Sequence, residues 1–397
     1  MNILYYIPNL SQKWGGVRQY AKGVLEIIAK ETGNKYFVYH NNGDPEIMEV
    51  LIQNPQLKLI KDNDVSYSKL NEYWQKSIRY LNIFLAKINL RGSLKVHTFI
   101  DALCEQYFID IIHCPYQFTP ITKKAKLITT MHDVQELHFP EFFTSQARAF
   151  RAVNHIDYLS IADKVIVSYD HVKTDLIKYF QIPENEIEIL LIKMNDLWVN
   201  HFSEEKIIDV KDITGDSDFL LYPANTWKHK NHLRLVEAIG LLRDKFNLNV
   251  KIICTGDKTE HFEDINNLVK KLNLENYIIF TDVVSEQTLY SLYKSCRAVV
   301  VPSLYEAGSF PLYESILLNI PVICSNVTSL PETIDNEECL FNPFITEDIA
   351  SKIKDVWTDN EFRNRIKEHL KIASKRISNN NPLPILQTIY LSLIKLN

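Results

Sequence analysis

Short apolar runs alternate with amphipathic stretches of helical length along almost the whole chain, and this alternation limits the fold more than any other feature. An apolar run bounded by turn residues is typical of a buried strand, whereas apolar residues every three or four positions are typical of a helix. Their alternation predicts parallel α/β layers. The expected strands are 2–7, 35–39, 57–60, 110–114, 126–131 and 164–168, then 219–224, 249–255, 277–281, 298–303 and 321–325.

The strand and helix pattern starts again in the second half, and 397 residues exceed what one ordinary core accommodates. We therefore expect two Rossmann-like domains, over 1–195 and 196–378, joined by a charged linker at about 193–217. Residues 379–397 are expected to form a helix that packs back toward the first domain. Two doubly wound sheets leave a crevice at the carboxyl ends of their strands, where such folds bind ligands.

Charge and cysteine content argue against several classes of protein. A net charge of −5 argues against a general nucleic-acid binder. The six cysteines have no C-x-x-C spacing, which indicates buried thiols in a reducing compartment. No apolar stretch reaches the roughly 18 residues that span a bilayer, and the start, "MNILYYIPNL", has no basic leader region. We therefore expect a cytoplasmic protein, which disfavours a periplasmic type of ligand-binding protein.

Two glycines, Gly15 and Gly16, follow the first expected strand. Glycine lets a backbone approach a ligand closely, and the start of the next helix offers free N–H groups to an anion. A tight turn without any ligand explains the same pair equally well. The absence of G-x-G-x-x-G counts against a dinucleotide-dependent dehydrogenase.

The segment "YPANTWKHKNHL", 222–233, ends a strand and opens a helix, with Lys228 and Lys230 at the boundary. The start of a helix carries partial positive charge, so cations there are unfavourable unless an anion such as phosphate joins them. Two solvated loop lysines are the alternative. We expect His229 and His232 to be loop and capping residues, because no second cluster completes a metal site.

The segment "YEAGSFPLYESI", 305–316, sets Glu306 and Glu314 around a transition from strand to helix. Pro311 suits the first helical turn, where its missing N–H costs nothing, and Glu314 is expected in that same turn. Both carboxylates would then point into the crevice around the free N–H groups of 308–312. Such a site suits a phosphate at the N–H groups and sugar hydroxyls at the carboxylates. Alternatively, Glu314 only stabilises the helix dipole and Glu306 lies on the surface.

The block "VVVPSLYEAGSFPLYESILLNIPVICSNVTSLPE" resembles the E-x7-E segment of glycosyltransferase family 4, whose members are retaining enzymes with the GT-B fold. "YPANTWKHKNH" resembles that family's donor-phosphate segment, "GGVRQY" its N-terminal glycine loop and "ITTMHDV" its acceptor-side segment. "ADKVIVSYDHVKTDL" is similar to the stretch that ends its first domain. The five segments occur in the family's order and cover nearly the whole chain.

The resemblance implies a role for each matching residue. On the donor side, Glu306 would bind sugar hydroxyls, Glu314 the ribose and Lys230 the diphosphate. The other donor-side positions are Gly16, Asn225, Lys228, Gly308, Ser309 and Phe310. The acceptor side has Gly15, His132 and Asp133, with His132 beside the reacting sugar. The catalytic positions would be His132, Lys230 and Glu306.

Three features depart from the family's pattern. Asn225 stands where an arginine is usual, five residues before Lys230, and Lys228 is a candidate to replace its charge. Ala307-Gly308-Ser309 stands where G-F-G is usual, which displaces the glycine of this loop. The usual N-G after the first domain is missing from "LLIKMNDLW".

The resemblance implies a retaining transferase that moves a hexose-type sugar from a nucleotide diphosphate sugar to a glycan or lipid-linked acceptor, in bacterial surface-polysaccharide synthesis. In the family's same-face route the leaving phosphate takes the acceptor's proton, so Glu306 positions the sugar. The paired carboxylates of a glycoside hydrolase act differently. No metal or other cofactor is expected, although the Asp-x-Asp triplets 62–64 and 216–218 leave a metal-dependent transferase open. A non-catalytic nucleotide-sugar-binding protein, favoured by Asn225, is the alternative from another class.

The segment 58–95 carries eight basic residues against three acidic ones, with aromatic residues between them. Basic and aromatic side chains favour the surface of an anionic membrane. The segment therefore predicts a peripheral contact with the cytoplasmic leaflet. A helix packed on the core, with a solvated basic face, is the alternative.

Overall fold

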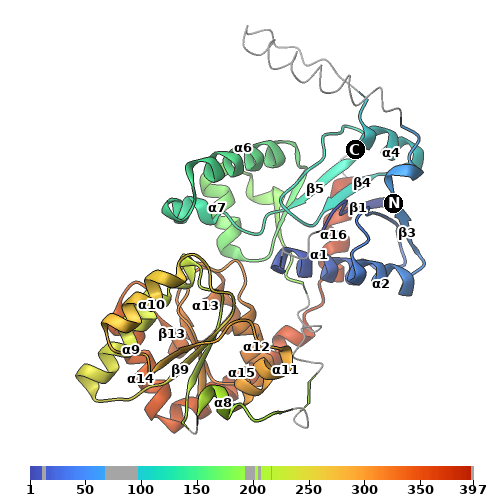
Figure 1. Cartoon of the computed structure of the whole chain (residues 1–397). Helices are drawn as coiled ribbons and strands as arrows, with labels where there is room; N and C mark the ends of the chain where they lie inside the picture. The colour runs from blue at the N-terminus through green and yellow to red at the C-terminus, as the bar shows by residue number, and fades with distance from the viewer. Residues whose placement is uncertain (11–14, 68–96, 193–201, 204–206, 216, 395–397) are drawn as a thin grey trace.

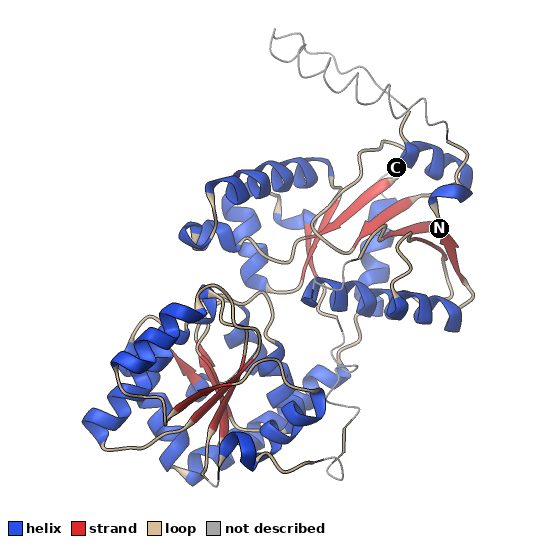
Figure 2. Cartoon of the chain, viewed as in Figure 1, coloured by secondary structure: helices blue, strands red, loops and turns tan. Residues whose placement is uncertain are grey.

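The computed structural model describes residues 1–10, 15–67, 97–192, 202–203, 207–215 and 217–394. These residues form two lobes, each built on a parallel sheet between layers of helices (Figure 1, Figure 2). The predicted architecture of two doubly wound α/β domains is confirmed. Because all strands of one sheet run the same way, the loops at their carboxyl ends gather at a single edge.

The N-terminal sheet has seven strands in the order β3-β2-β1-β4-β5-β6-β7. Its strands are β1 (Asn2–Tyr6), β2 (Lys35–Tyr39), β3 (Leu57–Ile60), β4 (Ile111–Cys114), β5 (Lys126–Thr130), β6 (Lys164–Val167) and β7 (Ile187–Ile189). The first six match the predicted runs, which are apolar because both faces of a parallel sheet are buried. The edge strand β7 was not predicted, since its three residues include a glutamate. The strand order reverses between β1 and β4, which places a ligand-binding crevice beyond their carboxyl ends.

Helices cover both faces of this sheet (Figure 2). They are α1 (Gly15–Ile28), α2 (Pro45–Gln53), α4 (Phe99–Tyr107), α5 (Gln135–His138), α6 (Ser145–Ile161) and α7 (Asp170–Phe180). α1 buries Tyr20, Ala21, Val24, Leu25 and Ile28, which recur at helical spacing in the sequence.

The C-terminal sheet has six strands in the order β10-β9-β8-β11-β12-β13. They are β8 (Leu220–Pro223), β9 (Ile252–Thr255), β10 (Ile278–Phe280), β11 (Ala298–Val301), β12 (Val322–Ser325) and β13 (Leu340–Phe341). Five match the predicted runs, whereas the two-residue edge strand β13 was too short to predict. The order reverses between β8 and β11, and these strands lead into the two segments that carry Lys230 and Glu306.

The helices of the C-terminal lobe pack on this sheet around one core. They are α8 (Lys211–Thr214), α9 (His232–Phe246), α10 (Phe262–Lys271), α11 (Glu286–Ser295), α12 (Phe310–Leu318), α13 (Ser329–Ile334), α14 (Thr346–Thr358) and α15 (Asn360–Asn379). Short 3-10 turns occur at η2 (Asp62–Asp64), η3 (Pro140–Phe142), η4 (Glu184–Glu186), η8 (Lys228–Lys230) and η9 (Glu337–Cys339).

The last helix, α16 (Leu383–Ile394), leaves the C-terminal lobe and lies in the N-terminal one (Figure 1). Its buried face joins the core around β1 and α1, and the Tyr390 hydroxyl lies 2.8 Å from Nδ1 of His113 on β4. The chain therefore passes between the lobes twice. The two passages are tied together, because the side chain of Asn380 donates a 2.8 Å hydrogen bond to the carbonyl of Leu191.

Other predictions meet the structure only in part. All six cysteines are free thiols, and five of them are buried. Among the helices within the described ranges, none combines the length and the apolar character needed to cross a bilayer. Most of the basic segment, 68–95, lies outside the described residues, as does the boundary predicted at residue 195.

Candidate active site between the two domains

A cavity of about 260 Å³ lies between the lobes, where the carboxyl ends of both sets of strands meet. Several residues predicted for the site line this cavity together. The N-terminal lobe supplies Gly16, His132 and Asp133, and the C-terminal lobe supplies Gly308 and Phe310. The structure therefore brings the predicted acceptor-side and donor-loop segments to one place.

The first turn of α1 contacts the donor loop directly. A Cβ atom on Gly16 would lie 3.4 Å from Cε2 of Phe310, so a side chain here would leave little clearance. Gly15 begins the helix, and 11–14 before it lie outside the described residues. The predicted glycine pair thus forms the start of α1, where free N–H groups collect.

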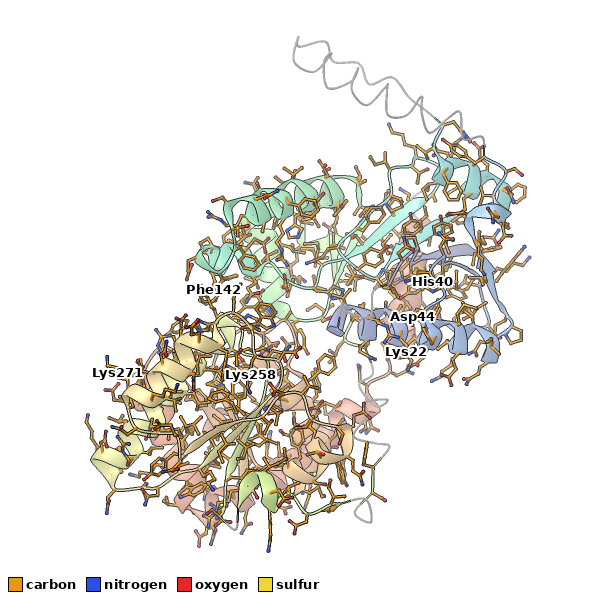
Figure 3. The ribbon with its side chains drawn as sticks, viewed as in Figure 1. Lys22, His40, Asp44, Phe142, Lys258 and Lys271 are labelled. Atoms are coloured by element: carbon orange, nitrogen blue, oxygen red, sulfur yellow. The ribbon has the colours of Figure 1, made fainter. Side chains whose placement is uncertain are left out.

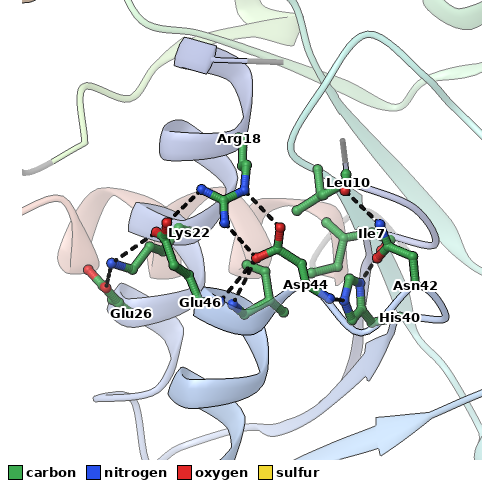
Figure 4. A network of polar contacts seen from close by, with 10 residues as sticks. Ile7, Leu10, Arg18, Lys22, Glu26, His40, Asn42, Asp44 and Glu46 are labelled. Carbon is green, nitrogen blue, oxygen red and sulfur yellow. Dashed lines mark hydrogen bonds and ion pairs between the residues drawn. The ribbon is translucent and has the colours of Figure 1, made fainter. Parts of the chain in front are cut away.

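A buried ionic network holds α1 against α2 (Figure 4). Nε and Nη2 of Arg18 each donate a 2.8 Å bond to the Asp44 carboxylate, and Nη1 donates at 2.7 Å to Glu46. Asp44 also caps α2 by accepting from two of its N–H groups, and its own N–H donates at 3.0 Å to Nε2 of His40. Such paired and satisfied charges fix geometry, so the network orients the helix that carries Gly16.

Lys230 and Glu306 form an ion pair of 2.7 Å between Nζ and Oε1. Glu306 is only 6% exposed and accepts a second bond, at 2.6 Å, from the hydroxyl of Ser303. The fully buried Tyr222 donates from its hydroxyl at 2.8 Å to the carbonyl of Lys230, which fixes the backbone there. Two residues predicted for adjacent parts of a sugar diphosphate therefore touch one another in this structure.

The lysine segment differs in detail from its predicted form. Lys228 and Lys230 belong to the short turn η8, and α9 begins only at His232. Asn231, between η8 and α9, has a left-handed backbone with φ +61°. Its side-chain amide donates 2.9 Å hydrogen bonds to the carbonyls of Pro302 and Pro343. Asn231 therefore joins this segment to the end of β11, a role that the sequence did not indicate. Lys228 is exposed.

His229, between the two lysines, is partly buried. Burial, together with the nearby Lys230 charge, lowers the pKa of His229 to about 4, so its imidazole is neutral. It adds no positive charge to the phosphate side of the site. Its carbonyl accepts a 2.7 Å bond from the N–H of Leu304, which again joins the segments after β8 and β11.

Asn225, which stands where the family has arginine, has a structural contact. Its side-chain oxygen accepts a 2.8 Å bond from the N–H of Asp257, after β9. Gly256, which directly precedes Asp257, has φ +124°, a conformation that favours glycine. A Cβ on Gly256 would lie 2.8 Å from the side-chain oxygen of Asn225, so only glycine fits here. The amide thus organises the neighbouring loop.

Glu314 lies elsewhere than predicted. α12 has no acidic residue in its first turn, so the prediction that placed Glu314 there is wrong; the glutamate lies in the second turn. It is 5% exposed, and the buried hydroxyl of Tyr293 on α11 donates to it at 2.5 Å. The predicted Pro311 position at the helix start is confirmed. The prediction assumed that α12 begins close enough to Glu314 to include it in the first turn. The helix begins earlier, at Phe310.

The N-terminus of α12 retains unused polar groups. Ser309 occupies the cap position, but its side chain does not cap the helix. It is 1% exposed, and its hydroxyl has no hydrogen-bond partner among the described residues. A buried hydroxyl without a partner costs free energy and is a common sign that a ligand completes the site.

His132 lies at the floor of the cavity on the acceptor side. Its Nε2 lies 3.1 Å from the carbonyl of Pro115, and its ring meets Tyr20 edge-on. Burial lowers the pKa of His132, although Asp133 acts against this, so the neutral ring is favoured. A carbonyl only accepts, so Nε2 carries the proton and Nδ1 is the acceptor. Asp133 itself accepts from Arg151 at 3.3 Å.

Each lobe inserts a tyrosine into the other. Tyr169, which follows β6, packs in the core of the C-terminal lobe, and a Cβ on Gly308 would lie 3.4 Å from its ring. Tyr305, which precedes Glu306, packs among His138, Phe139 and His171 of the N-terminal lobe. The sequence carries no signal for this exchange, because an aromatic residue at a strand end does not reveal which domain it will contact.

The described aspartates of the two acidic triplets have partners within the protein. Asp62 accepts bonds from Tyr39 and Asn41, and Asp218 pairs with Arg297, whereas Asp216 lies outside the described residues. Over the part of the chain with assigned positions, no three His, Cys, Asp or Glu side chains group as ligands.

Comparisons with known proteins agree with this geometry. Residues 203–372 match the family model "Glycosyl transferases group 1". The O-antigen chain mannosyltransferase B of Escherichia coli is 24% identical over 254 residues, which cover 64% of this chain and 66% of that protein. The O-antigen chain mannosyltransferase RfbU of Salmonella typhimurium is 25% identical over 227 residues, covering 57% and 60%. The matched part of the chain thus spans less than two thirds of either relative.

Solved structures share the whole fold. A glycosyltransferase from Rickettsia africae superposes with a TM-score of 0.66 at 20% identity, over 100% of this chain and 99% of the other. An Anabaena protein in complex with UDP and glucose gives 0.66 at 18% identity, over 100% of both chains. At such identities the likeness establishes the fold. The chain therefore has the GT-B fold, and its residues 203–372 match the glycosyl transferases group 1 family model.

Proposed function

We propose that this protein is a retaining glycosyltransferase that moves a hexose-type sugar from a nucleotide diphosphate sugar to a glycan or lipid-linked acceptor, in the synthesis of a bacterial surface polysaccharide. The observation that carries this proposal is the 2.7 Å ion pair between Lys230 and Glu306, which joins the segments after β8 and β11, with Glu306 four residues before the start of α12. The names of the relatives favour mannose as the sugar and an O-antigen as the product.

The donor side supplies groups that match a sugar diphosphate. Lys230 and the free N–H groups at the start of α12 stabilise the negative charge of a departing diphosphate. Glu306, held by Ser303, stays next to Lys230 and accepts hydrogen bonds from hydroxyls of the adjacent sugar.

We propose a same-face substitution. The acceptor's hydroxyl oxygen bonds to the anomeric carbon on the side from which the diphosphate leaves, while the bond between that carbon and the phosphate oxygen breaks. The hydroxyl proton passes to the departing phosphate oxygen, so no protein base is needed. His132 accepts a hydrogen bond from a sugar hydroxyl at Nδ1 and thereby orients the reacting sugar.

Two further parts of the proposal concern cofactors and the membrane. Lys230 and the helix N-termini meet the charge of the diphosphate, and turnover needs no metal ion. The peripheral contact between segment 58–95 and an anionic leaflet stays a prediction, based on the charges in the sequence.

The purified chain is tested with a panel of nucleotide sugars, including GDP-mannose and UDP-glucose, with and without glycan acceptors, in buffer that contains EDTA. We expect slow donor hydrolysis without acceptor and faster release of nucleoside diphosphate with the correct acceptor. Product anomers determined by NMR check retention. A protein that binds a nucleotide sugar but neither hydrolyses nor transfers it would instead be the non-catalytic binding protein.

A further inference from the structure

The cavity extends from His132 along α1 to Leu191 and Ile192, at the end of the N-terminal lobe; of the three predicted catalytic residues, only His132 is among the residues that line it. This extension is lined on one side by Gln19, Lys22 and Glu26, and on the other by Leu191 and Ile192. The three polar residues lie three, four and seven positions apart, which places them on one face of the helix. Figure 3 shows Lys22 at the edge of the N-terminal lobe that borders the passages.

The charges on this face are arranged for a neutral polar ligand. Nζ of Lys22 lies 3.5 Å from carboxylate oxygens of both Glu26 and Glu46 (Figure 4). These contacts are longer than the 2.7–2.9 Å typical of charged hydrogen bonds, so neither carboxylate holds the Lys22 ammonium in a short hydrogen bond. An anionic ligand would meet two carboxylates, and a cationic ligand would meet the lysine.

An alkyl chain is also a poor match. It would exclude water from Lys22 and Glu26 without giving either a hydrogen bond in return, which is costly for charged groups. A sugar ring has both kinds of surface that the cavity requires. Its hydroxyls donate to Glu26 and accept from Lys22 and Gln19, while its C–H face packs on Leu191 and Ile192.

Position along the helix separates this surface from the donor site. Gly16, beside Phe310, marks the donor end of α1. With a rise of about 1.5 Å per residue, Gln19 and Glu26 lie about 5 and 15 Å farther along the axis. Glu26, at the far end, lies farther from Gly16 than the length of one hexose, so this end of the surface suits a sugar unit of a bound acceptor.

We propose that Gln19, Lys22 and Glu26 form a binding subsite for a neutral sugar unit of the acceptor glycan. This inference rests on the proposed function for its assignment to an acceptor, but the binding of a sugar is testable without turnover. The three residues determine which acceptor is held, because they contact the glycan away from the reacting hydroxyl.

The test uses NMR titration with the methyl glycosides of disaccharides that contain mannose, glucose, galactose or N-acetylglucosamine. Binding is measured with and without a nucleoside diphosphate. The full chain should bind at least one of them. Glu26→Gln and Lys22→Met, which keep side-chain length, should weaken that binding tenfold or more, and Gln19→Ala several-fold. The matched control is Glu49→Gln on the exposed side of α2, outside the cavity, which should bind as the wild type does.

Wild-type affinity in all three cavity variants would overturn the subsite. So would a failure of the unmodified protein to bind any glycoside of the panel. Thermal midpoints identify a variant that fails to fold; exposed Gln19→Ala then still tests the site. Glycoside binding in a protein that neither hydrolyses nor transfers a donor sugar would refute the proposed transferase but would still support the sugar subsite.

Discussion

Tyr169 of the N-terminal lobe and Tyr313 of the C-terminal lobe hold their hydroxyl oxygens 2.6 Å apart in a buried contact across the domain boundary. Tyr305 crosses in the opposite direction and immediately precedes Glu306. The loop that carries Glu306 is therefore held by contacts to the other lobe. The arrangement of the domains and the geometry of the donor site depend on each other.

We expect Tyr169→Phe and Tyr313→Phe each to lower the thermal midpoint, because each leaves one buried hydroxyl without this partner, a loss of about 1 kcal/mol. The double variant should lose less stability than the two single variants lose together, because the second substitution removes the hydroxyl that the first left unpaired. Tyr179→Phe is the control. Tyr179 is exposed on α7, the helix that follows Tyr169, so its substitution should change the thermal midpoint little. Strict additivity in this cycle would mean that the two hydroxyls do not interact in solution.

Lys230→Ala should weaken both the binding of nucleoside diphosphate and turnover. Loss of a charged donor to a departing oxyanion costs about 2–4 kcal/mol, which corresponds to a decrease of roughly 30- to 1,000-fold in kcat/KM. Lys228→Ala, at the exposed neighbour, separates the two lysines: a small effect shows that Lys228 does not replace the missing arginine. Calorimetry and steady-state kinetics measure the two effects. Normal activity in Lys230→Ala would remove this residue from the site.

Glu306→Gln keeps shape but accepts hydroxyl protons more weakly, so it should impair sugar transfer more than binding of free nucleoside diphosphate. Glu314→Gln should instead weaken nucleotide binding, and it should also lower stability, because the buried Tyr293 hydroxyl loses a charged acceptor at 2.5 Å. Isothermal titration with diphosphate and with the intact sugar nucleotide distinguishes the two. The reverse pattern would show that the two glutamates have exchanged roles.

The sequence was informative where structure is local and failed where it depends on distant partners. Buried parallel strands are continuous apolar runs, so all but the short edge strands β7 and β13 were predictable. Gly16 and Phe310 were predictable because strand-to-helix junctions gather at one sheet edge, whereas His132 was predicted only from the resemblance to a family. The start of α12 was misplaced because Pro311 fits more than one position of a first turn. The pairing of Arg18 with Asp44 joins separate elements and has no local signal.

The buried histidines predict acid sensitivity. Burial lowers the pKa of both His113 and His232 to about 3, against about 6.5 in an unfolded chain. Between these values the unfolded state binds more protons, so the free energy of unfolding falls as the pH drops below about 6.5. Each histidine contributes up to about 1.4 kcal/mol per pH unit in this window. Denaturant titrations at pH 7.5 and 5 should show this loss.

A histidine exchange provides the control for the acid prediction. His113→Phe should reduce the pH dependence of the free energy of unfolding. It should also lower stability at neutral pH, because it removes the 2.8 Å contact with Tyr390. His97→Ala, at an exposed position, should leave the pH dependence as it is. Equal stability of the unmodified protein at pH 7.5 and 5 would contradict the neutral state of these buried rings.

Gly308 and Gly240 allow the same substitution to be compared at two positions with opposite expectations. A Cβ on Gly308 would lie 3.4 Å from both Cε2 and the hydroxyl oxygen of Tyr169, so this ring or the loop must shift slightly to admit it. Gly240 lies within α9, where the nearest atoms, on Leu272 and Leu274, are 3.5 Å away in ordinary contact. Gly240→Ala should therefore be neutral or stabilising by up to about 1 kcal/mol, since alanine favours a helix.

Gly308→Ala should lower kcat for transfer several-fold, because it displaces the donor loop beside Glu306, while the thermal midpoint changes little. Steady-state kinetics and thermal melts of both variants decide the matter, and full activity in Gly308→Ala would show that the contact with Tyr169 is absent during turnover.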